Sequence, residues 1–117
     1  MQHTDPTLDK IFFALSDSTR RGMLARLCEG ATSIGELGAP YAISSPAISR
    51  HIRVLEGAGL IRREVAGRVH TCALTRTGLR SAEDWLNFHR QFWETRLDAL
   101  EALVLENTTG RKEQQKK

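Results

Sequence analysis

Apolar residues at helical spacing predict two short helices in the first thirty residues of the chain. The first helix is predicted by apolar residues three or four positions apart, namely Leu8, Ile11, Phe12 and Leu15. The segment Ser16-Asp17-Ser18 then supplies side-chain oxygens that can cap a second helix. In that second helix Met23, Leu24 and Leu27 are expected to face the core, and Gly30 is expected to end it.

Two further helices are predicted from their capping signals. Ser33 followed by Glu36 has the spacing of a capping box, and the helix that it opens can extend only to about Pro40. Ser45-Pro46 combines a capping residue with a proline at the first helical position. The buried stripe of this fourth helix is expected to consist of Ile48, Ile52 and Leu55. Gly57 and Gly59 are expected to end it.

A β-hairpin and a long helix complete the predicted elements. Residues 60–65 and 68–74 are short runs rich in branched or apolar residues, and the pair Ala66-Gly67 between them predicts a turn. From 75 to 106 only Gly78 interrupts the helical pattern. The broad apolar face of this helix is formed by Trp85, Leu86, Phe88, Phe92, Trp93, Leu97, Leu100, Leu103 and Val104. Residues 81–106 would span roughly 39 Å, which is more than a domain of this size can cover by itself.

Length and composition favour one ordinary globular domain. The chain has 117 residues, of which 40% are hydrophobic and 26% charged. We expect a single domain over 1–107, followed by a disordered polar tail over 108–117 that lacks apolar residues. No apolar run reaches the length of a membrane span and the N-terminus does not resemble a signal peptide, so we expect a cytoplasmic protein that does not bind membranes. Two cysteines without CxxC spacing favour a reducing compartment and argue against structural zinc.

The positive charge is concentrated in the central third of the chain. Residues 44–80 hold seven arginines and two acidic residues, a balance of +5, whereas the remainder has ten basic and twelve acidic residues, a balance of −2. This distribution is typical of a surface that binds a polyanion such as nucleic acid. The alternative is a solvated charged face, which charge alone does not exclude.

The order of helices and strands is that of a winged helix-turn-helix, α-α-α-α-β-β-α, a mainly helical fold with a small β-hairpin. Three segments resemble the ArsR family of bacterial transcriptional regulators: ALSDSTRRGMLARL at 14–27, SSPAISRHIRVLEGAGLIRRE at 44–64 and VAGRVHTCAL at 65–74. The resemblance covers about 8–106, and its most specific part is the pattern Ser44-Ser45-Pro46-x-x-Ser49-Arg50-His51-Ile52-x-x-Leu55 followed by Ala58-Gly59-Leu60-Ile61. One departure is Ser18, where the family often has proline, and serine is tolerated in a first helical turn.

The resemblance implies that the fourth helix enters the major groove of double-stranded DNA. Small side chains would let this helix approach closely, and the Arg50 guanidinium could form a fork on guanine. The other arginines are assigned to phosphates, which position a protein without reading sequence. His51 suits a DNA contact and structural packing equally. The expected DNA-binding residues are Ser44, Ser45, Ala47, Ser49, Arg50, His51, Arg53, Arg62, Arg63 and Arg68.

The aromatic face of the last helix has two interpretations, a pocket for a small apolar effector or the core of a homodimer. The family pairs its first and last helices, and an apolar patch of this size is unusual on a soluble monomer, so the dimer is favoured. The expected interface residues are Leu8, Ile11, Phe12, Phe92, Trp93, Leu97, Leu100 and Val104.

The ligand motifs of the metal-sensing members of the family are missing. The family's Cys-x-Cys pair corresponds to Ser33-Ile34-Gly35, and its Asp-x-His motif corresponds to Asn87-Phe88-His89, with leucine at position 100 where a second histidine would follow. We therefore expect no metal and no cofactor, and His89 to be a helix-surface or interface residue. Cys28 and Cys72 could sense oxidants, although free cysteine is more often a buried hydrophobe. An effector, if one exists, is not identified by the sequence.

The function predicted from these features is that of a homodimeric repressor that binds an inverted-repeat operator and does not respond to metals. The alternative is a winged-helix module for protein interactions, against which the arginines of the fourth helix and the hairpin argue. An enzyme is not expected, because no catalytic motif stands out from the helical pattern.

Overall fold

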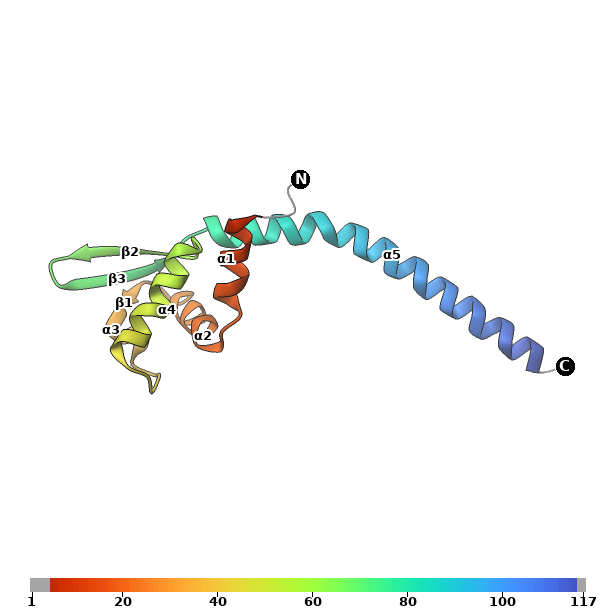
Figure 1. The fold of residues 1–117 in the computed structure, drawn as a ribbon, viewed down its shortest axis with the longest axis horizontal. Helices are drawn as coiled ribbons and strands as arrows, with labels where there is room; N and C mark the ends of the chain where they lie inside the picture. The colour runs from red at the N-terminus through yellow and green to blue at the C-terminus, as the bar shows by residue number, and fades with distance from the viewer. Residues whose placement is uncertain (1–4, 116–117) are drawn as a thin grey trace. The chain divides into compact units, whose positions relative to one another are not determined.

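The computed structural model describes the backbone of residues 5–115 and the side chains of residues 5–108. Its elements follow the expected winged helix-turn-helix order with one addition, a two-residue strand after the second helix (Figure 1). They are α1 (Pro6–Leu15), α2 (Ser18–Leu27), β1 (Thr32–Ser33), α3 (Ile34–Gly38), α4 (Ser45–Gly57), β2 (Ile61–Ala66), β3 (Val69–Leu74) and α5 (Thr77–Gln115). The mainly helical winged fold predicted from the sequence is therefore confirmed.

Four short polar side chains cap the first four helices, each by accepting a backbone N–H in the first turn. They are Asp5 for α1, Asp17 for α2, Ser33 for α3 and Ser44 for α4. The cap of α4 lies one residue earlier than expected, because Ser44 has extended backbone angles while Ser45 is already helical. Since Pro46 has no N–H, the Ser44 hydroxyl accepts from the next available donor, Ala47, at 3.3 Å.

The three strands form an antiparallel sheet in the order β1-β3-β2. β2 and β3 pair from Ile61 opposite Leu74 to Ala66 opposite Val69, so the turn is Gly67-Arg68 and not the expected Ala66-Gly67. Gly67 has a φ of 62°, which glycine adopts without steric cost at the first central position of a hairpin turn. The register therefore places Arg68 at the tip of the hairpin formed by β2 and β3, which is the wing of the fold.

The described part of the chain divides into two compact units, one ending at Glu83 and the other beginning at Asp84. The core of the first unit draws on every helix and on both long strands. Its buried residues are Ile11, Ala14, Met23, Leu27, Leu37, Ile52, Leu55, Ala58, Leu60, Ile61, Cys72 and Ala82. Ile11, which we expected at a dimer interface, is 0% exposed and belongs to this core. The helical period explains this, because Ile11 shares the inward face of α1 with Ala14.

The second unit consists of the greater part of α5, which continues to Gln115. The backbone of residues 108–115 is helical. The segment lacks apolar residues but is rich in lysine, arginine, glutamate and glutamine, which are good helix formers. Among the described residues, no helix is both long and apolar enough to cross a membrane.

Candidate nucleic-acid interface

The N-terminal half of α4 presents small polar side chains and one long cation on the side away from the core. Ile52 and Leu55 are buried on the inner face, while Arg50 and Arg53 are exposed. The small residues expected to approach DNA are exposed at Ser44 and Ser45 and half-buried at Ala47 and Ser49. The amphipathic pattern of the helix therefore separates a packing face from a free face, as the sequence predicted.

The wing exposes two of its three arginines. Arg68 lies in the turn and is exposed. The Arg62 guanidinium lies 3.6 Å from the Glu64 carboxylate, with both side chains more than half exposed, so solvent and salt screen this ion pair strongly. Arg62 and Arg68 can therefore each bind a phosphate without losing a strong ion pair.

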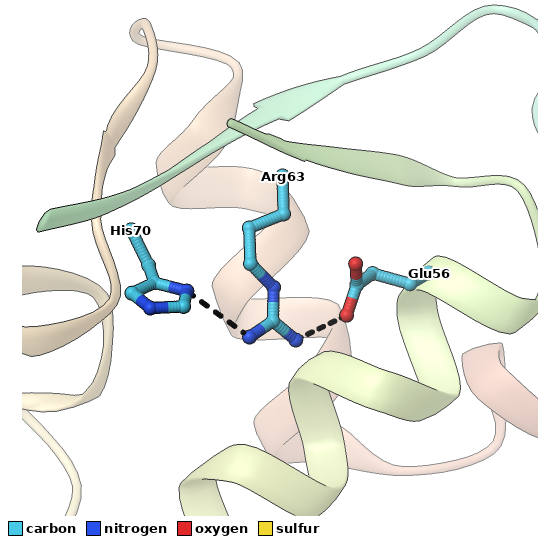
Figure 2. A network of polar contacts seen from close by, with 3 residues as sticks. All are labelled: Glu56, Arg63 and His70. Carbon is cyan, nitrogen blue, oxygen red and sulfur yellow. Dashed lines mark hydrogen bonds and ion pairs between the residues drawn. The ribbon is translucent and has the colours of Figure 1, made fainter. Parts of the chain in front are cut away.

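Arg63 points to the other face of the hairpin and is not the free surface cation that we expected. Its guanidinium bonds to the Glu56 carboxylate at the end of α4, and its Nη1 lies 3.4 Å from Nδ1 of His70 on β3 (Figure 2). The bond to Glu56 raises the pKa of Arg63. The prediction for Arg63 did not allow for the alternation of side chains along a strand. This alternation places Arg62 and Arg63 on opposite faces of the hairpin. Through these contacts Arg63 links the hairpin to α4.

Arg20 bonds to His51, and this role of Arg20 was not predicted from the sequence. Arg20 is 7% exposed, and it donates from Nε to the Ala14 carbonyl at 2.9 Å and from Nη2 to the Phe13 carbonyl at 2.9 Å. Its Nη1 lies 3.0 Å from Nδ1 of His51. The buried guanidinium therefore joins the end of α1 to α4 through His51, which favours the packing role among the two that the sequence left open. The helical period was the available signal, because Arg20 lies three and seven residues before Met23 and Leu27 on the inward face of α2, whereas its neighbour Arg21 is exposed.

Asp17 completes this junction between α1, α2 and α4. Its carboxylate accepts from the Arg20 backbone N–H at 3.0 Å. That hydrogen bond, helped by the charge of Arg20, lowers the pKa of Asp17. The ionised carboxylate is thus favoured at the N-terminus of α2, where the helix dipole also favours negative charge.

The residues expected at a dimer interface fall into three groups. Those of α5 are strongly exposed, among them Trp93 at 54% and Leu97 at 61%. Leu8 is partly buried against the core, and Phe12 on the same helix is 39% exposed. The third group is Ile11 alone, which is in the core. The exposed residues expected at the interface on α5 are Phe92, Trp93, Leu97, Leu100 and Val104.

His89 lies within an aromatic cluster on α5. Its ring centroid is 4.4 Å from that of Trp85 and 5.1 Å from that of Phe88. Within the described part of the chain, no group of three or more histidine, cysteine or acidic residues could hold a metal ion. Burial raises the pKa of the Cys72 thiol, which disfavours the reactive thiolate, whereas Cys28 is exposed.

Comparison with known proteins agrees with this fold. A helix-turn-helix domain family matches residues 15–64. The chain is 34% identical over 96 residues to the HTH-type transcriptional regulator Rv2034 of Mycobacterium tuberculosis, covering 82% of this chain and 87% of the relative. It is also 34% identical to the transcriptional repressor SdpR of Bacillus subtilis over 82 residues, covering 69% of this chain and 91% of the relative.

Solved structures of similar fold include a member of the ArsR family. The crystal structure of the ArsR family transcriptional regulator RHA00566 superimposes with a TM-score of 0.72 at 40% identity, covering 75% of this chain and 97% of the other. An ArsR-like transcriptional regulator from Rhodococcus sp. RHA1 gives a TM-score of 0.68 at 28% identity, covering 83% and 92%. With its helix-turn-helix, its arginine-bearing wing and these relatives, the chain belongs to the ArsR family of transcriptional regulators, which are DNA-binding proteins and not enzymes.

Proposed function

We propose that this protein is a homodimeric repressor that acts in the cytoplasm and binds an inverted-repeat operator through α4 and the wing. The observation that carries the proposal is the free face of α4, where Arg50 stands among small residues close to a wing with arginine at its tip. Ser49 of α4 and Arg68 of the wing line the same cavity, so the helix and the wing meet on one side of the unit. The repressor SdpR is a relative whose activity is consistent with this role.

Within this proposal the DNA-facing residues divide into two roles. Arg50 reads a guanine through its two parallel N–H groups, and Ser44, Ser45, Ala47 and Ser49 let the helix approach the bases. The exposed cations Arg53, Arg62 and Arg68 bind phosphates and fix the orientation of the protein on the duplex.

The proposal of a homodimer rests on the apolar face of α5. Five large apolar or aromatic residues of the expected interface are exposed on this one helix, and such a patch on a soluble protein marks an interaction surface. A second copy would cover this face, and a two-fold axis would match the two half-sites of an inverted repeat.

Independence from metals is part of the same proposal. The positions where the family's ligand motifs would lie hold Ser33, Gly35, Asn87 and Leu100, none of which supplies a thiolate or an imidazole. His89 is held among aromatic rings instead.

The salt dependence of DNA binding tests the proposal. Each neutralised phosphate contributes about −0.9 to the slope of log affinity against log salt concentration. Three exposed phosphate-binding arginines in each subunit of a dimer predict a slope of about −5 on duplex DNA taken from upstream of the protein's own gene. A slope near zero in a gel-shift or fluorescence-anisotropy titration would overturn the DNA-binding role, and footprinting on the same fragment locates the operator.

A further inference from the structure

A cavity of about 480 Å³ lies between α3, α4 and the wing in the first unit. It is lined by residues of five elements and the hairpin turn, among them Ser33 of β1, Ser49 of α4, Arg63 of β2, Arg68 of the turn and His70 of β3. The cavity is open to solvent. Ser33, Arg63 and His70 have the partners described above, whereas Ser49 and Arg68 make no side-chain hydrogen bond or ion pair among the described residues.

The polar side chains that line the cavity can all donate hydrogen bonds. A guanidinium has no acceptor, so Nδ1 of His70 accepts from Nη1 of Arg63, and a neutral His70 then carries its proton on Nε2 (Figure 2). The Ser33 oxygen already accepts from the Glu36 backbone N–H, which leaves its hydroxyl proton to be donated. No carboxylate is among the described residues that line the cavity.

The cavity also carries net positive charge. The charge of Arg63 is balanced by Glu56, which bonds it from α4 outside the lining. Arg68 has no ion pair to any described residue, so its guanidinium supplies the unbalanced charge. Hydroxyl, imidazole and guanidinium donors around one positive space are the chemistry that a tetrahedral oxyanion requires.

We propose that this cavity binds a phosphate group and thereby holds the wing against the recognition helix. The proposal rests on the proposed function in so far as the duplex backbone is one source of the phosphate, while a free phosphate-bearing molecule is the other. The volume exceeds that of a bare phosphate and leaves room for an attached sugar. A phosphate in this position accepts hydrogen bonds from α4, the turn and β3 together, so its binding restrains the wing relative to α4.

Nuclear magnetic resonance of the full chain tests the site with inorganic phosphate as the probe. The signals to follow are the ring of His70 and the guanidinium of Arg68, titrated with sodium phosphate and, at equal ionic strength and pH, with sodium chloride. Saturable shifts with phosphate alone are expected. Equal responses to the two salts would overturn the proposal.

Two variants remove donors from the cavity without disturbing the network of Arg63. Arg68→Gln and Ser49→Ala should each weaken phosphate binding, Arg68→Gln by tenfold or more because it removes a charge-assisted donor. Arg26→Gln is the matched control, because Arg26 is an exposed arginine of α2 outside the cavity. Spectra of each variant without phosphate establish that it is folded. If both folded variants bind phosphate as tightly as Arg26→Gln does, the site is wrong.

A second titration separates the two sources of the phosphate and also separates this proposal from the proposed function. A mixed-sequence duplex of 30 base pairs is added first, and phosphate afterwards. Loss of the phosphate response in the DNA complex assigns the cavity to the duplex backbone, and a response that persists assigns it to a free phosphate-bearing molecule. A protein that binds phosphate but no duplex would refute the proposed function and leave the site standing. Binding of the duplex without any phosphate response would refute the site alone.

Discussion

Arg50 carries the base-reading role in the proposed function. It is exposed on the free face of α4, and no ion pair to a described residue competes for its guanidinium. Arg50→Ala should therefore cost about 1–3 kcal/mol of binding free energy on the operator and relax base preference at one position in each half-site. Binding measured against a library of operator variants gives both quantities. Arg68→Ala, the comparison, should weaken all sequences alike because it removes a phosphate contact.

Arg20 shows how a single buried cation can connect three helices. Its guanidinium satisfies two carbonyls at the end of α1 and the Nδ1 atom of His51 on α4. Arg20→Met should lower the free energy of unfolding by about 3 kcal/mol, since it leaves these three acceptors without their donor. Arg21→Met is the control, because Arg21 is exposed and makes one such bond, to the Leu15 carbonyl at 2.7 Å. Urea denaturation compares them, and equal midpoints would contradict the connecting role.

The position of a side chain could be predicted from the sequence only where the periodicity of its own helix or strand determines it. The free face of α4 follows from helical periodicity, so the exposure of Arg50 and Arg53 was predictable. Arg20 and Arg63 depend on partners that the chain brings together only when it folds, six to thirty-one residues away in sequence. Arginine patterns alone therefore overestimated the number of free cations on the wing.

At the scale of elements, capping and turn residues placed the start of α4 and the hairpin turn to within one residue, and these two errors share a cause. Two adjacent serines both qualify as a cap for α4, and a glycine next to alanine or arginine fits a hairpin turn in either register. Strand β1 escaped prediction because two residues carry no periodicity, and its pairing with β3 is set by tertiary contact. The candidate cavity was unpredictable for the same reason, since it needs β1, α4 and the hairpin together.

The junction between α4 and α5 gives a prediction at this scale. A Cβ added at Gly78 would lie 2.6 Å from the Ala58 carbonyl oxygen and 2.8 Å from that of Gly59, so the start of α5 can pack on the end of α4 only with glycine there. Gly78→Ala should destabilise the fold by about 1–3 kcal/mol. Gly57→Ala is the matched control, with no atom within 4 Å of the added Cβ, and should be neutral or stabilising by up to about 1 kcal/mol. Thermal unfolding of both proteins measures the difference, which a lower midpoint for Gly57→Ala would contradict.

At the scale of the whole molecule, the proposed homodimer couples α5 to DNA binding. Leu97 is 61% exposed on the apolar face of α5, so in a two-fold interface Leu97→Glu would place a carboxylate in an apolar contact beside its symmetry mate. We expect the dimer to dissociate. A monomer can occupy one half-site but not two successive major grooves about 34–36 Å apart, so specific affinity should collapse although no DNA-facing residue has changed.

Sedimentation and a gel shift on the palindrome measure this coupling together. Gln91→Glu is the control, because it adds the same charge to an exposed polar position of the same helix and should leave the dimer intact. A Leu97→Glu protein that stays dimeric would refute the interface. A folded monomer with undiminished operator affinity would refute the dependence of recognition on dimerisation, and α5 would then serve a different partner.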